Sequence, residues 1–163
     1  MILGLSIATF TLVHVAISLV GIATGLLVLA AMLRGHFLPG LTAMFLATSL
    51  LTSLTGFLFP ISAFTPALAT GVLSTVILAF ALLALYAFHL ANAWRPIYVV
   101  TTVAALYLNV FVAIVQAFQK LGPLQALAPT QSEPPFLVAQ GVVLALFVIA
   151  GFIAAKTFRP ALS

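Results

Sequence analysis

The residues that could carry chemistry in this chain are few and widely spaced. Its 163 residues include three histidines, one acidic residue, five lysines and arginines, and no cysteine. A thiolate metal site, a disulfide and a cysteine nucleophile are therefore excluded. The strongly polar side chains that remain within apolar sequence are His14, Asn109, Gln116 and Gln140. What they can do depends on the elements that hold them.

The composition leaves almost nothing from which to build a water-exposed surface. Of the residues, 65% are hydrophobic and 4% are charged, whereas a soluble domain carries about 25% charged residues. The excess apolar surface must face lipid, and the mean hydropathy of +1.39 agrees. The net charge of +4 does not indicate nucleic-acid binding, because the basic residues form no patch. The expected partner is the lipid bilayer.

Five apolar stretches are long enough to cross a bilayer as helices, which takes about 20 residues each. Prolines mark the breaks, and none falls in the middle of a stretch, where it would remove a backbone hydrogen bond that lipid cannot replace. The sequence predicts an all-α polytopic membrane helix bundle, a single transmembrane domain spanning 1–163. Its helices are expected at about 5–33, 41–59, 66–93, 96–118 and 135–155.

The basic residues are distributed unevenly between the two sides of such a bundle. Four fall in the odd-numbered connections and the C-terminal tail, namely Arg34, Arg95, Lys156 and Arg159. The even-numbered connections carry Lys120, together with the acidic Glu133. Because basic residues accumulate in cytoplasmic loops, this pattern predicts an N-terminus outside and a C-terminus in the cytoplasm.

With this orientation, every helix places polar side chains in the outer half of the membrane. His14 would lie about 14 Å below the outer end of its helix, at 1.5 Å per residue. Unpaired polar groups are costly in lipid, so these faces are expected to converge on a ligand-binding pocket open to the outside. The candidate lining residues are His14, Ser18, Ser53, Ser74, Asn109, Gln116 and Gln140. The loop with Lys120 and Glu133 is the expected lid.

Each of these features also has a structural interpretation. Gly21 and Gly25 have the GxxxG spacing that allows two helices to approach closely. The hydroxyls of 41–59 could donate to carbonyls of their own helix, and Asn109 and Gln116 could join helices. His14 could be a neutral partner of either amide. These interpretations favour a non-catalytic accessory or structural subunit of a membrane complex, or a homo-oligomer.

Catalysis, transport and metal binding fit the sequence less well. A haem needs two axial ligands at similar depth, whereas His14 and His89 would differ by about 20 Å. Ion-coupled transport usually needs a charged residue inside the membrane, and the expected helices contain none. We therefore assign no catalytic residue, metal ligand or cofactor, and rank a small-solute channel, a transporter and a haem protein lower.

Binding remains as the favoured function. A mouth lined by His, Asn and Gln above an aliphatic floor would suit a small neutral or amphiphilic ligand, such as a lipid- or quinone-like molecule. The ligand could enter from the outer leaflet.

Three segments carry a resemblance to other proteins. LTSLTGFLFP (51–60), YLNVFVAIVQAFQK (107–120) and LAPTQSEPPFLVAQ (127–140) are similar to a family of small multi-pass membrane proteins of proteobacteria that has no assigned activity. The similarity covers most of the chain from the second expected helix onward. It implies a bacterial inner membrane and transfers no functional residue.

Overall fold

The computed structural model describes residues 1–60 and 66–160, and within these ranges it is helical with no β-strand. The long helices are α1 (Ile7–Leu33), α2 (Pro39–Gly56), α3 (Pro66–Leu82), α4 (Trp94–Lys120) and α6 (Pro134–Thr157). A single π-helical turn, η1 (Leu83–Ala87), continues α3, and a short helix, α5 (Gly122–Leu127), lies between α4 and α6. The all-α prediction is confirmed.

Four of the described helices are long and apolar enough to cross a membrane. They are α1, α4, α6 and the segment Leu68–Ala87 of α3 and η1. The chain is therefore a membrane-embedded helix bundle. The 18-residue α2 is rich in serine and threonine and is not one of the four.

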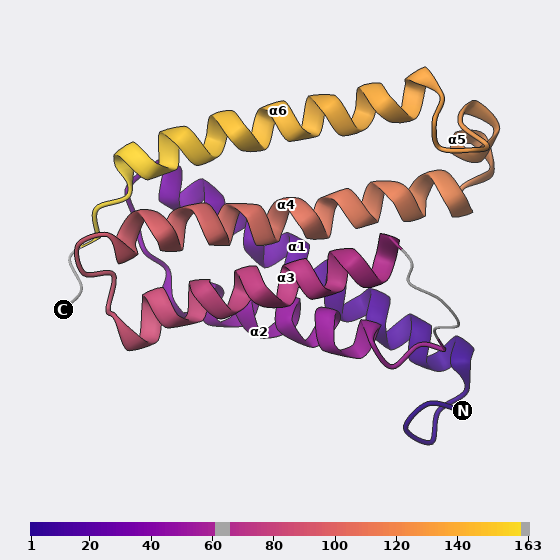
Figure 1. Ribbon diagram of the computed structural model, residues 1–163, viewed down its shortest axis with the longest axis horizontal. Coiled ribbons are helices and arrows are strands. Elements are labelled where there is room, and N and C mark those ends of the chain that lie inside the picture. The colour runs from indigo at the N-terminus through magenta and orange to yellow at the C-terminus, as the bar shows by residue number, and fades with distance from the viewer. Residues whose placement is uncertain (61–65, 161–163) are drawn as a thin grey trace.

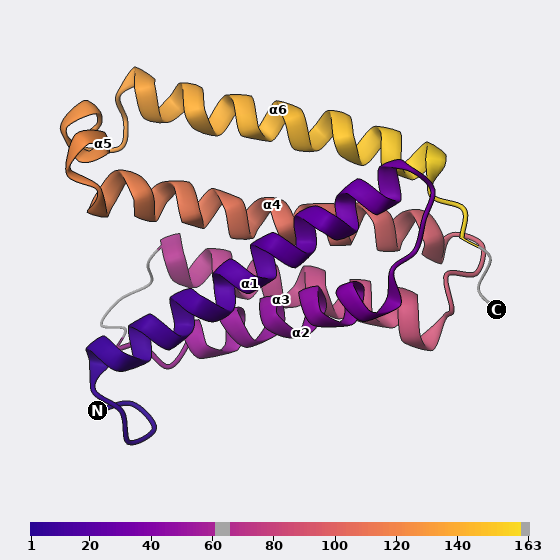
Figure 2. The same cartoon turned by 180° about the vertical axis from the view of Figure 1, so that it is seen from behind.

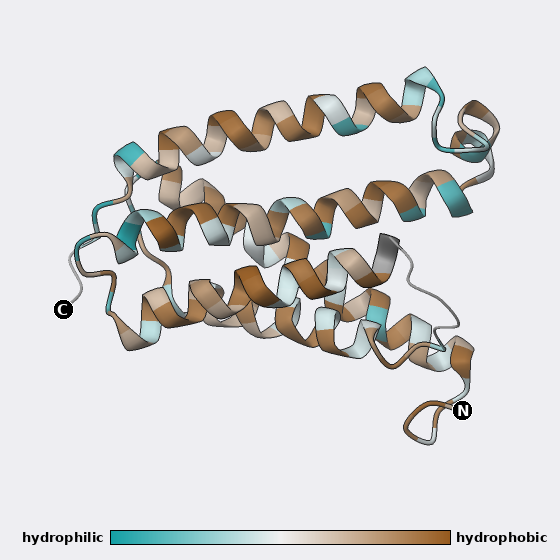
Figure 3. Cartoon of the chain, viewed as in Figure 1, coloured by the Kyte–Doolittle hydropathy of each residue, from teal (hydrophilic) through white to brown (hydrophobic). Residues whose placement is uncertain are grey.

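The helices pack in sequence-adjacent pairs around α4. Helix α1 packs on α2, α3 packs on α4, and α4 packs on α6. In Figures 1 and 2, α4 and α6 run side by side, while α1 crosses the bundle diagonally. Only 6% of the apolar 18-residue stretch of α6 is buried inside the bundle, so this helix is peripheral. Figure 3 shows hydrophobic residues along the lengths of the helices and hydrophilic ones mainly near their ends.

Glycine provides the closest helix contact in the core. A Cβ atom on Gly25 of α1 would lie 2.5 Å from Leu106 Cδ1 and 2.8 Å from the Phe45 ring. A Cβ on Gly21 would lie 3.1 Å from Thr48 Oγ1. All three distances are shorter than ordinary contact, so the packing interpretation of the GxxxG pair accounts for these two glycines.

Four basic residues lie at one end of the bundle, which we call the basic end: Arg34, Arg95, Lys156 and Arg159. The C-termini of α1 and α6 meet there, since Thr157 Oγ1 donates to the Met32 carbonyl at 3.0 Å. Lys120 and Glu133 lie at the opposite end, where α4 ends and α6 begins.

The expected third helix, 66–93, is too long. Helix α3 ends at Leu82, η1 ends at Ala87, and the chain then turns irregularly toward α4. His89, Leu90 and Asn92 have φ angles of 47°, 56° and 49°. L-residues cannot continue a right-handed helix through this left-handed region, so the helix must stop. A hydropathy profile does not reveal this change to a left-handed backbone conformation.

The other boundaries differ by smaller amounts. Helix α1 begins two residues later than expected because Ser6 caps it, its Oγ accepting from Thr9 N–H at 3.1 Å. Helix α2 is Pro39–Gly56 instead of 41–59, and α4 is longer at both ends than 96–118. Helix α6 is Pro134–Thr157 instead of 135–155, and Glu133 at its N-cap position makes no capping side-chain hydrogen bond. Each proline lies in a first helical turn or outside the helices, within the described residues.

Candidate functional site

His14 is the most constrained polar side chain among the candidates. It lies on α1 and is half-buried, with Nδ1 2.8 Å from Thr55 Oγ1 on α2. The Thr55 hydroxyl also lies 2.6 Å from the Leu51 carbonyl, four residues earlier in α2. A hydroxyl has one proton, and a carbonyl can only accept. Thr55 therefore donates to Leu51 and accepts from His14, so Nδ1 carries the imidazole proton.

This hydrogen bond leaves Nε2 of His14 as an unprotonated acceptor. Among the described residues no hydrogen bond to Nε2 is found. The ring is fixed on one side by Phe59, whose centroid lies 5.3 Å away in an edge-to-face arrangement. Lys120, the last residue of α4, is exposed at the same end of the bundle. The geometry thus presents an oriented lone pair at the end of the bundle opposite the basic end.

Two other candidates are paired directly with neighbouring helices. Asn109 Nδ2 donates to Ser49 Oγ at 2.8 Å and joins α4 to α2. Gln140 Nε2 donates to the Phe111 carbonyl at 3.2 Å and joins α6 to α4. The Oε1 atom of Gln140 is buried without a partner. These are separate interhelical contacts and do not surround His14.

The remaining candidates are dispersed. Ser18 Oγ donates to the Val15 carbonyl and Ser53 Oγ to the Ser49 carbonyl, so each is satisfied within its own helix. Ser74 is buried on α3. Gln116 is exposed on α4. The structure therefore leaves the candidate set spread over several helix contacts.

The loop expected as a lid is folded onto itself. The Glu133 carboxylate accepts from Thr130 N–H and Oγ1 at 3.1 and 2.8 Å, and from Ser132 N–H at 3.1 Å. Slight desolvation raises the pKa of Glu133, but these hydrogen bonds outweigh it and the pKa lies below its usual value. Helix α5 lies beyond the ends of α4 and α6, on the far side of α4 from α2 (Figures 1 and 2).

Sequence reasoning missed a buried hydroxyl cluster near the basic end. Thr42, Tyr98 and Thr102 are 0%, 0% and 3% exposed. The Tyr98 hydroxyl faces both threonines, yet none of the three oxygens has a partner at hydrogen-bonding geometry. The available signal was a threonine and a tyrosine within the first turns of α2 and α4. The sequence prediction did not use it, because it considered only the polar side chains in the outer half of the membrane.

The histidines and the acidic residue do not form a metal-binding cluster among the described residues. No three His, Cys, Asp or Glu side chains among them gather closely enough to hold a metal ion. His89 lies after η1, near the start of α4, whereas His14 lies toward the opposite end of the bundle.

Comparison of the chain with protein-family models, curated proteins and solved structures finds no match. The class defined by the fold is an all-α, membrane-embedded helix bundle.

Proposed function

We propose that α2 is the fifth crossing helix, with the N-terminus outside and the C-terminus in the cytoplasm of a bacterial inner membrane. Its 18 residues span about 27 Å, close to the thickness of about 30 Å of a hydrocarbon core. Its hydroxyls do not oppose insertion, because Thr48, Thr52 and Ser53 each donate to a carbonyl of the same helix. The concentration of basic residues at one end supports the orientation, and the resemblance of 51–60, 107–120 and 127–140 to proteobacterial proteins supports the compartment.

We further propose that the protein binds a small neutral or amphiphilic molecule, lipid- or quinone-like, in the outer half of the bilayer beside His14. The observation that carries this proposal is the combination of an Nδ1–H held by Thr55 and an Nε2 with no hydrogen-bond partner among the described residues. A half-buried acceptor in lipid is costly unless a donor reaches it.

The geometry favours a particular ligand chemistry. Because Nε2 accepts, the ligand should present a hydroxyl, as a hydroquinone or a hydroxylated lipid does. Lys120, which lies at the same end of the bundle, can only donate, so it suits a carbonyl or ether oxygen on the same headgroup. An apolar tail would lie against the exposed aliphatic residues of α1, such as Val13 and Leu19.

A photoreactive probe tests this proposal. The purified protein in lipid nanodiscs is irradiated with an alkyl hydroquinone that carries a diazirine, and the modified peptides are mapped by mass spectrometry. We expect labelling concentrated on α1 and α4 near His14 and Lys120, and a reduction of about tenfold in H14A, as loss of a buried hydrogen bond implies. The control H89A should label normally. Uniform labelling, or labelling unchanged in H14A, would refute the site.

A structural role is the second candidate, and the direct pairs favour it. The Asn109–Ser49 and Gln140–Phe111 contacts join three helices, as expected of residues that only fix packing in an accessory subunit or homo-oligomer. A double-mutant cycle with N109L and S49A should then give a coupling of about 0.6 kcal/mol, at most about 1.7. If neither variant changes stability but both abolish probe labelling, the residues serve the ligand instead.

A further inference from the structure

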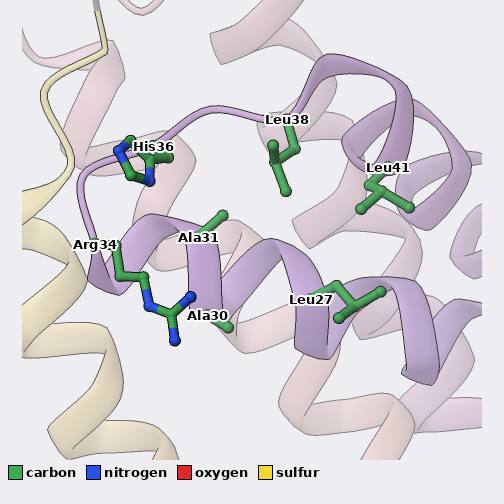
Figure 4. A pocket seen from close by; sticks show the side chains of 7 residues that line it. All are labelled: Leu27, Ala30, Ala31, Arg34, His36, Leu38 and Leu41. Carbon is green, nitrogen blue, oxygen red and sulfur yellow. The ribbon is translucent and has the colours of Figure 1, made fainter.

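The turn between α1 and α2 contains a hollow at the basic end. Its cavity volume is about 330 Å³, and its lining residues are Leu27, Ala30, Ala31, Arg34, His36, Leu38 and Leu41. In Figure 4, His36, Leu38 and Leu41 lie across from the last turns of α1, and the Arg34 side chain extends from the end of α1 on the side away from the connecting segment. The small side chains of Ala30 and Ala31 leave room for this hollow beside the last turns of α1.

The lining has two parts: aliphatic residues, which we call the floor, and the basic residues Arg34 and His36 at the opening. The floor is aliphatic and opens sideways toward lipid, since Leu27 is 54% and Leu38 is 38% exposed. Arg34 and His36 stand at the helix end, where the chain leaves α1, and both are exposed. The left-handed Gly35 between them, with φ of 75°, makes the tight turn that holds both residues at one site.

Arg34 has no anionic side-chain partner among the described residues. The chain contains one acidic residue, Glu133, which lies at the opposite end of the bundle and bonds to its own loop. The basic end therefore carries positive charge that no acidic side chain compensates, and an anion from outside the chain can bind there. In a membrane, the anion available at this depth is the phosphate of a lipid headgroup.

We propose that this hollow binds one anionic phospholipid from the adjacent leaflet. The phosphate would accept hydrogen bonds from the Arg34 guanidinium, which presents a fork of donors suited to phosphate oxygens, and from the His36 imidazole. One acyl chain would lie along Leu27, Ala30 and Leu41. The site is separate from the one beside His14 and does not depend on it.

Binding of palmitoyl-oleoyl phosphatidylglycerol to the delipidated full chain in detergent, followed by native mass spectrometry, tests the proposal. Phosphatidylcholine with the same acyl chains is the neutral comparison. We expect tighter binding of the anionic lipid, weakened about fivefold in R34Q, as a contribution of about 1 kcal/mol per basic residue near a membrane implies. R159Q removes the same charge at the same end, outside the hollow, and should weaken binding less than twofold.

A second variant separates the hollow from charge alone. A30F fills the floor without changing charge, and it should weaken phosphatidylglycerol binding at least as much as R34Q does. Circular dichroism of each variant checks that the bundle remains folded. Equal weakening by R34Q and R159Q, unchanged binding in A30F, or equal affinity for the two lipids would overturn the proposal.

Discussion

His14 on α1 donates from Nδ1 to the Thr55 hydroxyl on α2, across 2.8 Å. This bond sets the tautomer of the imidazole and its orientation, and it ties the first helix to the second near the end opposite the basic residues. The proposal of a ligand site depends on this tautomer, because only it leaves Nε2 as an acceptor.

The first prediction concerns that tautomer. Nitrogen-15 NMR of selectively labelled histidine should show a neutral His14 ring protonated on Nδ1. T55V removes the acceptor, so the ring should lose its preference for this tautomer and stability should fall by about 0.6 kcal/mol. T55S keeps the hydroxyl and should retain the wild-type spectrum. A wild-type His14 protonated on Nε2 would contradict the assignment.

Tyr98 supports a second prediction. Its hydroxyl is buried beside those of Thr42 and Thr102, and none of the three pairs at hydrogen-bonding geometry. Y98F removes this unsatisfied oxygen and should raise the free energy of unfolding by about 1 kcal/mol. Y86F, at a residue that is 55% exposed, should leave it unchanged. A clear loss of stability in Y98F would show that the hydroxyl is paired with Thr42 or Thr102 in the membrane.

Gly25 leads to a third prediction. G25A places a methyl group against the Phe45 ring and Leu106 Cδ1, closer than contact allows, and should destabilise the bundle by about 1–3 kcal/mol. G141A on α6 is the matched control, because nothing lies within 4 Å of its added Cβ. It should be neutral or stabilise the helix by up to about 1 kcal/mol. Equal effects of the two substitutions, measured by thermal unfolding, would contradict the close approach of α1 to its neighbours.

Glu133 provides a fourth prediction, of pH dependence. Its pKa lies below the usual value of 4.5 in the folded loop, where hydrogen bonds from Thr130 and Ser132 favour the carboxylate. The contribution to loop stability is therefore complete above the unfolded pKa and is lost as pH falls through the lower, folded pKa. The protection of the Thr130 and Ser132 amides, measured as the exchange rate relative to the intrinsic rate at each pH, should fall in that acidic window. In E133Q the same amides should exchange fast already at neutral pH, without this additional acidic step.

Composition and proline positions were sufficient to predict a membrane helix bundle, because lipid constrains both so strongly. They did not predict Thr55 as the partner of His14, since the sequence suggested Asn109 or Gln116. Depth along a helix can be estimated from residue spacing, but the crossing angle and rotation of α1 against α2 decide which hydroxyl it meets. That geometry depends on contacts such as the one between Gly25 and Phe45. The glycine spacing predicts a close helix contact but does not say which residue lies opposite. The early end of the third helix likewise follows from the left-handed backbone conformation at His89 and Asn92. A hydropathy profile does not encode this conformation.

The central claim is that five helices cross the membrane and that the His14 site lies in the outer half. The chain has no cysteine, so single cysteines at His36, Pro60 and Ser132 can be labelled with a membrane-impermeant maleimide without background. In intact bacterial cells permeable only at the outer membrane, P60C and S132C should react, and H36C should react only after the inner membrane is opened. Labelling of H36C and P60C from the same side would show that α2 does not cross. Reaction of H36C alone in intact cells would place His14 in the inner half and contradict the account.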